Sequence, residues 1–255
     1  MNTLILGHKG YLGSYLLKHL NSDILFDRNI YDNGHKYDYV INCIAKANLE
    51  YCEINKEESE YSNKNIIHDI IKYYPDAKII NFSSYYVYDD IPICTENSNV
   101  TYKYNYTRQK LESEQLIKNG VTFRVGKLFG NIFNTQNKLT EHILKNDTVK
   151  LDNVRFNPTS VNQILDIIKW ELKFNKLYGI FNIANDGYCT HYEYGLFIDK
   201  ILNSNKCIIN VENIGKNFDN YGRFLMSCDK IKQYINLINW KDDVKNYIVD
   251  YKNNI

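Results

Sequence analysis

Three residues with acid–base or hydrogen-bonding side chains, Ser84, Tyr106 and Lys110, fall on neighbouring predicted elements. Residues 104–118 have a helical pattern, and the four-residue spacing of Tyr106 and Lys110 puts the phenol and the ammonium on one helical face. Ser84 stands just beyond the apolar strand predicted at 77–82, at the end where open α/β sheets bind ligands. A hydroxyl that holds a carbonyl oxygen and a phenol that protonates it are what carbonyl reduction needs, once a nicotinamide supplies the hydride.

Each of these residues is expected to have one role. Tyr106 supplies the proton, and the charge of Lys110 lowers the pKa of the phenol from its usual value of about 10. Ser84 donates a hydrogen bond to the substrate oxygen. The alternative is a solvent-facing tyrosine and lysine beside a serine that caps a helix. Because the chain has 23 tyrosines, such a pair can arise by chance, and the prediction therefore also needs a cofactor site.

The first stretch of the chain has the pattern of such a site. A continuous apolar run, 4–6, is typical of a strand buried on both faces, and leucines at helical spacing follow it. Between them, glycines at three-residue spacing let the chain bend, let a pyrophosphate approach and leave N–H groups at the helix start. The alternative is an ordinary glycine-rich turn. The predicted cofactor contacts here are Gly7, Lys9, Gly10, Tyr11, Leu12 and Gly13.

The second predicted strand, 24–26, ends at Asp27 and Arg28, where this kind of fold contacts the adenosine ribose. An acid there would hold the ribose hydroxyls of NAD, whereas Arg28 together with Lys9 could hold the 2′-phosphate of NADP. Each charge alone could also be a surface charge. Because two cations converge, we favour NADP(H), and NAD(H) is the alternative.

The third predicted strand, 39–45, ends at the same edge. We therefore predict that Cys43, Ile44 and Ala45 also contact the cofactor, as Tyr106 and Lys110 do. Only a short stretch, 29–36, separates this strand from the second, so the strand and helix that usually intervene are expected to be abbreviated.

The composition points to a small-molecule partner. Lys and Arg number 31 against 30 Asp and Glu, and the basic residues are scattered, so neither nucleic acid nor a membrane surface is expected as a partner. The amino terminus leads directly into a strand and no apolar run approaches a membrane span, so we expect a cytoplasmic protein. The six cysteines form no C-x-x-C pair or His/Cys cluster, and no metal site or disulfide framework is predicted.

The order of strands and helices predicts an α/β fold, a Rossmann-type doubly wound parallel sheet with a small C-terminal substrate-binding lobe. The dinucleotide-binding core is predicted at 1–130 and completed by 159–184. The lobe is built from 131–158 and 185–255. Further predicted elements are a helix at 57–74, strands at 121–125 and 180–184, a helix after the turn at 157–160, a strand at 207–211, and two last helices ending near Trp240 and Tyr247.

The chain resembles the extended short-chain dehydrogenase/reductase superfamily, and within it the dTDP-4-dehydrorhamnose reductase group, nearly end to end. Residues 7–13 (GHKGYLG) resemble G-x-x-G-x-x-G, 40–42 (VIN) resemble V-I-N, and 83–89 (SSYYVYD) resemble S-T-D-Y-V-F-D. Tyr106 and Lys110 fall on Y-x-x-x-K. Further segments similar to the group's motifs are Cys52-Glu53 with Asn63, 158–160 (PTS), 179–183 (GIFNI) and 190–194 (THYEY).

The resemblance implies an NAD(P)H-dependent reductase of the 4-keto group of a nucleotide-linked 4-keto-6-deoxyhexose. It implies that Arg223, which resembles the group's late R-P arginine, helps to bind the nucleotide sugar. Tyr85 replaces the acid of S-T-D and Phe224 replaces the proline after Arg223, so the sugar pocket is expected to differ. The predicted substrate contacts are Tyr85, Tyr86, His142 and Arg223.

Two other functions stay open. Related enzymes that epimerise and reduce use a Cys where this chain has Tyr86 and a His or Lys near His142, so the missing thiol favours simple reduction. A bifunctional epimerase/reductase in which Tyr86 or another residue replaces the thiol is one alternative. A non-catalytic dinucleotide-binding regulatory subunit is the other, because some members of the group serve partners without known turnover. Homodimers formed through a helical face are common in this fold, and the sequence indicates no particular face.

Overall fold

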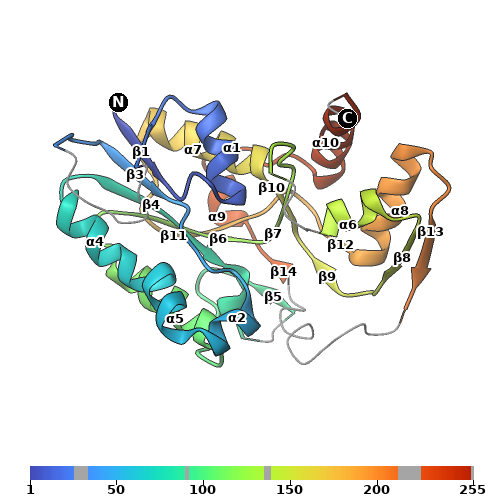
Figure 1. Cartoon of the computed structure of the whole chain (residues 1–255), viewed down its shortest axis with the longest axis horizontal. Coiled ribbons are helices and arrows are strands. Elements are labelled where there is room, and N and C mark those ends of the chain that lie inside the picture. The colour runs from blue at the N-terminus through green and yellow to red at the C-terminus, as the bar shows by residue number, and fades with distance from the viewer. Residues whose placement is uncertain (26–33, 90–91, 135–138, 212–224, 254–255) are drawn as a thin grey trace.

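The computed structural model describes residues 1–25, 34–89, 92–134, 139–211 and 225–253, and a parallel sheet of six strands lies at its centre (Figure 1). The strand order is β2-β1-β3-β4-β6-β11. These strands are β1 (Thr3–Leu6), β2 (Asp23–Ile24), β3 (Tyr39–Asn42), β4 (Lys78–Ser84), β6 (Gly120–Val125) and β11 (Gly179–Ile183). The doubly wound parallel sheet predicted from the sequence is confirmed. Its second strand is two residues long, and Phe26 lies outside the described residues.

Eight further strands form two-stranded pairs outside the central sheet. They are β5 (Ile93–Cys94) with β14 (Leu225–Met226), β7 (Lys127–Phe129) with β10 (Pro158–Ser160), β8 (Thr148–Leu151) with β13 (Cys207–Asn210), and β9 (Arg155–Phe156) with β12 (Cys189–Thr190). Three of the pairs are parallel, and the pair of β9 with β12 is antiparallel.

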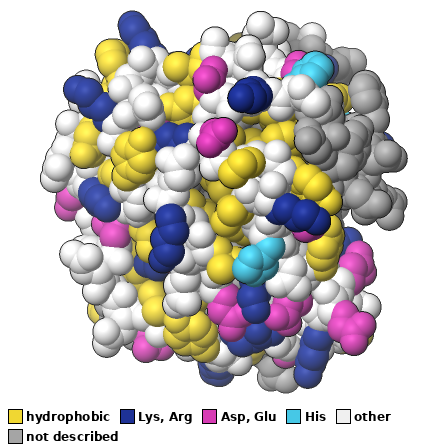
Figure 2. Space-filling view, turned by 90° about the vertical axis from the view of Figure 1, so that its left-hand side faces the viewer, with side chains coloured by type: hydrophobic (Ala, Val, Ile, Leu, Met, Phe, Trp, Pro, Cys, Tyr) yellow, Lys and Arg dark blue, Asp and Glu magenta, His cyan; other side chains and the backbone are white. Residues whose placement is uncertain are grey.

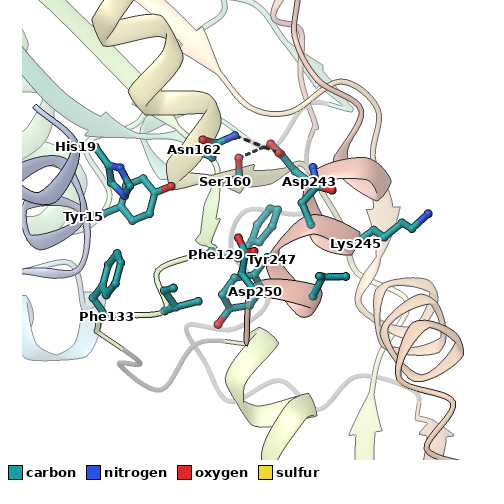
Figure 3. A pocket seen from close by; sticks show the side chains of 14 residues that line it. Tyr15, His19, Phe129, Phe133, Ser160, Asn162, Asp243, Lys245, Tyr247 and Asp250 are labelled. Atoms are coloured by element: carbon teal, nitrogen blue, oxygen red, sulfur yellow. Dashed lines mark hydrogen bonds between the residues drawn. The ribbon is translucent and has the colours of Figure 1, made fainter. Parts of the chain in front are cut away.

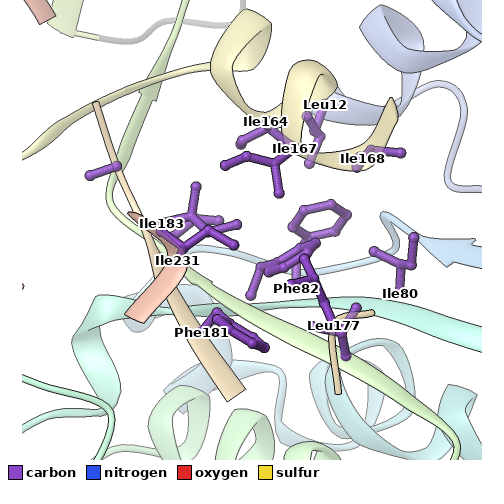
Figure 4. Close-up of a cluster of buried hydrophobic side chains, with 14 of the residues drawn as sticks. Leu12, Ile80, Phe82, Ile164, Ile167, Ile168, Leu177, Phe181, Ile183 and Ile231 are labelled. Atoms are coloured by element: carbon purple, nitrogen blue, oxygen red, sulfur yellow. The ribbon is translucent and has the colours of Figure 1, made fainter. Parts of the chain in front are cut away.

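Helices cover both faces of the sheet, with α1 (Tyr11–His19) and α7 (Val161–Phe174) on one face and α4 (Ile66–Tyr73) and α5 (Asn105–Leu116) on the other (Figure 1). Successive strand residues point to opposite faces, so Ile5 belongs to the core under α1 and α7 while Leu4 and Leu6 pack with α4. Figure 4 shows the first of these cores, with Leu12, Ile80, Phe82, Ile164, Ile167, Ile168, Leu177, Phe181, Ile183 and Ile231 labelled. Burial on both faces explains the continuous apolar runs in the sequence.

The segment predicted as one helix at 57–74 is three consecutive helical pieces. They are α3 (Lys56–Glu60), a π-helical turn η1 (Tyr61–Asn65) and α4, and a short helix α2 (Leu49–Ile54) precedes them. The predicted helix at 104–118 corresponds to α5, and a 3₁₀ turn η2 (Tyr85–Val87) follows β4 directly.

A second cluster of buried side chains lies beside the sheet, where Figure 1 shows α6 (Leu139–Lys145), α8 (His191–Leu202) and α10 (Trp240–Asn253). Members of this cluster are Phe129, Ile143, Val149, Leu151, Phe156, Cys189, Tyr194, Ile198, Trp240, Val244, Tyr247 and Ile248. Most come from the two segments predicted to form the lobe, and the division into core and lobe stays a prediction.

The prediction of a helix ending near Trp240 is wrong, because Trp240 begins α10. Its N–H donates to the carbonyl of Asp186, and its indole ring packs against Phe197 at 5.1 Å between centroids. The short helix before it is α9 (Asp229–Lys232).

The charges on the face shown in Figure 2 are mixed, with basic and acidic side chains interspersed among polar and apolar ones. Lys64, Arg108, Glu60 and Glu112 form one such mixed network across α3, η1 and α5. Within the part of the chain that the structure describes, none of the helices has the length and apolar character needed to cross a membrane.

Candidate active site

The turn between β1 and α1 is built so that only glycine fits at two of its positions. Gly7 has a φ of +75°, and a Cβ there would lie 2.8 Å from the carbonyl carbon of Cys43. A Cβ on Gly13 would lie 2.2 Å from the carbonyl oxygen of Gly7. The three glycines therefore bring the start of α1 against the turn and the turn against the end of β3, as the sequence predicts for a dinucleotide site.

The N-terminus of α1 is suited to bind an anion. Gly10 is its N-cap, no side chain caps it, and its first turn has no acidic residue. The N–H groups of a helix's first turn lack partners within the helix and, with the helix dipole, attract phosphate. The main chain at Tyr11, Leu12 and Gly13 is thus placed to hold a pyrophosphate.

The side chain of Tyr11 has other partners than a cofactor: its phenol contacts Glu141 and Asn131. Its phenol lies 3.5 Å from Glu141 Oε1 and accepts a hydrogen bond from the N–H of Asn131 at 3.1 Å. The contact of Tyr11 with the cofactor stays a prediction, and it concerns the main chain, because the ring ties α1 to the loop before α6. Lys9 is exposed, and its carbonyl accepts a hydrogen bond from Asn134.

The end of β3 lies beside the glycine turn. The N–H of Cys43 donates to the carbonyl of Leu6, and Asn42 accepts from the N–H of Ile44 at 3.1 Å and donates to Asn81 at 2.9 Å. Ala45 lines a hollow of about 480 Å³ with the residues that follow it. Cys43 and Ile44 are thus adjacent to Gly7 and Ala45 follows them, and their contact with the cofactor stays a prediction.

Asp27 and Arg28, predicted at the adenosine ribose, lie outside the described residues. Arg223, predicted at the nucleotide sugar, does so too.

Ser84 and Tyr106 lie near each other in the interior of the fold. Ser84 ends β4, Tyr106 stands in the first turn of α5, and the Ser84 hydroxyl is near enough to the phenol to influence its pKa. Tyr106 is 5% exposed and packs against Leu49 and Cys52 of α2. The Ser84 hydroxyl also accepts a hydrogen bond from the N–H of Tyr86 at 3.2 Å. The two residues, which are 22 positions apart in the sequence, are thus neighbours in the fold.

Lys110 lies one turn further along α5 and is buried, and its ammonium donates to the carbonyl of Phe82 in β4 at 2.9 Å. Burial lowers the pKa of Lys110 to about 8, against the opposing effect of Glu114.

Burial raises the pKa of Tyr106 well above its usual value, and the nearby Ser84 hydroxyl only partly offsets this. The expectation that Lys110 lowers the pKa of this phenol is therefore not met. The loss of hydration dominates at Tyr106, and the ammonium of Lys110 is directed to a backbone carbonyl.

Tyr85 and Tyr86 continue from Ser84 in η2, and their rings stack at 4.4 Å between centroids. Tyr86 packs against the cluster of Leu49, Cys52 and Tyr106, so it lies next to the predicted proton donor. His142 is exposed on α6 and is paired with Asn146 one turn on, and the contacts described here do not bring it to Ser84 or Tyr106.

Two supporting residues had no role assigned from the sequence. Asn63, in the π-helical turn η1, bonds the main chain of Lys46 through both its oxygen (2.8 Å) and its amide (3.1 Å), and it donates to Gln109 of α5. Glu53 of α2 accepts from the N–H and the side-chain amide of Asn105, both at 2.7 Å. Both residues fall in segments that resemble the family motifs, and the fold connects Asn63 to the loop after β3 and Glu53 to the start of α5.

Another cavity, of about 470 Å³, lies between α1, α7 and α10 and contains none of the predicted site residues (Figure 3). Asp243 at its wall accepts hydrogen bonds from Ser160 and Asn162, drawn as dashed lines, and from Asn185 at 2.6 Å. These bonds join α10 to the start of α7, so Asp243 holds the structure together.

The protein has the architecture of the short-chain dehydrogenases/reductases. Its sheet is doubly wound and parallel, its first strand runs into a glycine turn, and a serine, a tyrosine and a lysine lie at the carboxyl edge of the sheet. Within that class, the model of the RmlD substrate binding domain family matches residues 1–253, and the chain belongs to this family. A search among curated protein sequences found no match.

Solved structures share this fold over their whole length. The dTDP-4-dehydrorhamnose reductase of Clostridium acetobutylicum is 20% identical with a TM-score of 0.83, covering 99% of this chain and 100% of that one. The dTDP-4-dehydrorhamnose reductase of Bacillus anthracis, in complex with NADP, is 18% identical with a TM-score of 0.83, covering 98% and 99%. RMD from Pseudomonas aeruginosa, complexed with NADPH, is 14% identical with a TM-score of 0.79, covering 100% and 99%.

Proposed function

We propose that the protein is an NADPH-dependent oxidoreductase that reduces the 4-keto group of a nucleotide-linked 4-keto-6-deoxyhexose in activated deoxysugar biosynthesis. The observation that carries the proposal is that Ser84 and Tyr106 are buried beside each other, with Lys110 one helical turn further along α5. Membership of the RmlD family supports the same activity. The NADP and NADPH complexes of similar structures support the cofactor.

The described residues fit a dinucleotide. A Cβ at Gly7 or Gly13 would clash with neighbouring backbone atoms, so glycine is needed for the tight turn at which a pyrophosphate can approach. The N-terminus of α1 has no side-chain cap and can receive the pyrophosphate. The reduced nicotinamide would supply the hydride. The preference for NADP(H) over NAD(H) depends on Arg28 and Lys9, as proposed from the sequence.

Tyr106 and Ser84 act on one substrate oxygen. A reduction needs a protonated donor, and burial keeps the Tyr106 phenol protonated across the neutral pH range because it raises the pKa. Ser84 accepts from Tyr86 and uses its own hydroxyl proton to hold the oxygen in place. Lys110 is held by its hydrogen bond to the Phe82 carbonyl of β4. Its positive charge at this position would orient the cofactor.

The lobe of 131–158 and 185–255 would hold the nucleotide sugar. The proposed contacts of the nucleotide sugar are Tyr85, Tyr86 and Arg223. Tyr86 is the best supported of these because it packs beside Tyr106. His142 is retained as a proposed contact on the family resemblance alone.

The test is to mix the purified protein with NADPH and the dTDP-, UDP-, GDP- and CDP-linked 4-keto-6-deoxy sugars. We expect NADPH to be consumed with at least one sugar and the product to carry the cofactor's hydrogen at C4. If high enzyme concentrations turn over none of them while cofactor still binds, the proposal is wrong and the regulatory subunit is favoured.

The same reaction run in deuterated water separates simple reduction from epimerisation. Reduction alone places no solvent deuterium on C3 or C5 of the sugar, and deuterium at either carbon would assign the bifunctional activity.

A further inference from the structure

Lys127, His191 and Asp152 form a hydrogen-bonded chain that the proposed mechanism does not use. The ammonium of Lys127 lies 3.0 Å from His191 Nε2, and His191 Nδ1 lies 2.8 Å from Asp152 Oδ1. The side chains of His191 and Asp152 are 16% and 15% exposed, and Lys127 is half-buried. Such a sequence of cation, imidazole and carboxylate is more than a surface ion pair, because each member fixes the next.

The hydrogen-bond directions follow from the chemistry of the three groups. An ammonium can only donate, so Nε2 of His191 accepts from Lys127, and the ring proton therefore stands on Nδ1 and points to Asp152. Burial and the charge of Lys127 lower the pKa of His191 to about 4, which keeps the imidazole neutral. The positive charge of the hydrogen-bonded series Asp152, His191 and Lys127 is therefore carried by Lys127.

The backbone of Lys127 stands just beyond the carboxyl end of β6, the edge of the sheet where ligands bind. In the pairing of β4 with β6, Ser84 stands opposite Val125, and Lys127 follows Val125 by two residues at the start of β7. Its partners come from the other side of the junction, since Asp152 follows β8 and His191 begins α8. Figure 1 shows β7, β9 and β12 where the sheet meets the lobe.

The backbone beside Lys127 is fixed as well. A Cβ on Gly126 would lie 2.5 Å from the Thr159 hydroxyl and 2.6 Å from the carbonyl of Asn157, so this stretch packs closely against β10. The ring of Phe156 lies 5.6 Å from the Lys127 ammonium. Both ends of the lysine side chain are therefore positioned before a ligand arrives.

We propose that Lys127, positioned by His191 and Asp152, binds the diphosphate of the nucleotide-linked substrate. This inference rests on the proposed function, because that function supplies the diphosphate. A lysine ammonium is a compact charge that suits phosphate oxygens, and Lys127 follows the strand residue that pairs with Ser84 by two positions. Lys127 is thus a binding residue, and His191 and Asp152 are positioning residues.

The test measures nucleoside diphosphate binding by calorimetry. Wild type, Lys127→Met and Lys127→Arg are titrated with dTDP, UDP, GDP and CDP, and with the nucleoside of the diphosphate that binds best. We expect Lys127→Met to raise the Kd of that diphosphate about 10- to 100-fold and to leave nucleoside binding unchanged. Lys127→Arg keeps the charge and should stay within about fivefold of wild type. Lys64→Met, which removes a lysine paired with Glu60 and Glu112, is the matched control and should change nothing.

NADPH binding and the far-UV circular dichroism spectrum report whether each variant is folded. A diphosphate Kd unchanged in folded Lys127→Met, equal losses in the Met and Arg variants, or a wild type that binds none of the four diphosphates would each overturn the inference. Failure of the proposed function is a separate outcome, in which the wild type binds a nucleoside diphosphate but reduces no keto sugar.

Discussion

Burial acts in opposite directions on the two titratable side chains at the centre of the site. It raises the pKa of Tyr106 and lowers that of Lys110 to about 8, because in each case the charged form loses hydration. The phenol therefore keeps the proton that a reduction consumes. The ammonium keeps its charge at neutral pH but loses it within the pH range that an enzyme assay can reach.

The rate of reduction is expected to fall as the pH rises through about 8, since Lys110 is charged below that value and neutral above it. Lys110→Met removes the charge at every pH and should lower kcat/KM at neutral pH by about 100-fold, to the level that wild type approaches at high pH. The measurement is kcat/KM for the active keto sugar between about pH 6 and about pH 10. A wild-type profile that stays flat across this range would exclude Lys110 as the titrating group.

At the residue scale, the sequence predicted the identity of the reacting groups better than their electrostatics. The spacing of Tyr106 and Lys110 on one helix, and the place of Ser84 after a strand, follow from periodicity and from the ligand edge of an α/β sheet. The dominance of burial over the charge of Lys110, and the turning of the Tyr11 phenol toward Glu141, depend on packing between distant segments. No local pattern encodes that packing.

At the element scale, α5 depends on its neighbours to aim Tyr106. Glu53 on α2 binds the N–H and the amide of Asn105, the residue before Tyr106, and a carboxylate at a helix N-terminus is also favoured by the helix dipole. Asn63 in η1 links α5, through Gln109, to the main chain of Lys46 after β3. The cofactor edge and the catalytic helix are thus held by the same short helices.

Glu53→Gln is expected to destabilise the protein by about 1–2 kcal/mol and to lower kcat more than the affinity for NADPH, because an amide donor would then face a donor of Asn105. Thermal unfolding and steady-state kinetics measure the two effects. Glu50→Gln changes an exposed carboxylate of the same helix and serves as the control. Equal behaviour of the two variants would remove Glu53 from the positioning of α5.

The elements that the sequence misplaced are those shaped by single tertiary contacts. The apolar spacing at 57–74 predicts one helix, but the buried amide of Asn63 bonds outside its own helix and the segment contains a π-helical turn there. The start of α10 at Trp240 follows from its bond to the Asp186 carbonyl and its packing on Phe197. The long strands were predictable because continuous apolar runs define them.

At the scale of the whole molecule, one buried carboxylate joins segments from three parts of the chain. Asp243 of α10 is 3% exposed and accepts from Ser160 at the start of α7 and from Asn185 after β11. It therefore ties the proposed lobe to the strands and helices of the core (Figure 3).

Asp243→Ala should destabilise the protein by about 2–3 kcal/mol, because the polar groups of Ser160 and Asn185 would be left buried without an acceptor. Differential scanning calorimetry measures the change. Asp242→Ala, at the exposed neighbouring position, should cost less than about 1 kcal/mol. Equal midpoints for the two variants would show that the bonds to Asp243 do not hold the lobe.

The doubly wound parallel sheet agrees with the sequence, since one parallel crossover after another leaves few arrangements. The abbreviated connection predicted at 29–36 lies largely outside the described residues and stays a prediction. The joining of core and lobe was not predictable, because Asp243, Ser160 and Asn185 are far apart in the chain and carry no shared pattern.

The most direct test of the central claim compares Tyr106→Phe with Tyr102→Phe, which alters an exposed tyrosine just before α5. Both variants are assayed for NADPH-dependent reduction of the active keto sugar and titrated with NADPH. The account predicts that Tyr106→Phe lowers kcat at least about 100-fold with nearly unchanged NADPH affinity, and that Tyr102→Phe behaves as wild type. Wild-type turnover by Tyr106→Phe would contradict the assignment of the buried phenol as the proton donor.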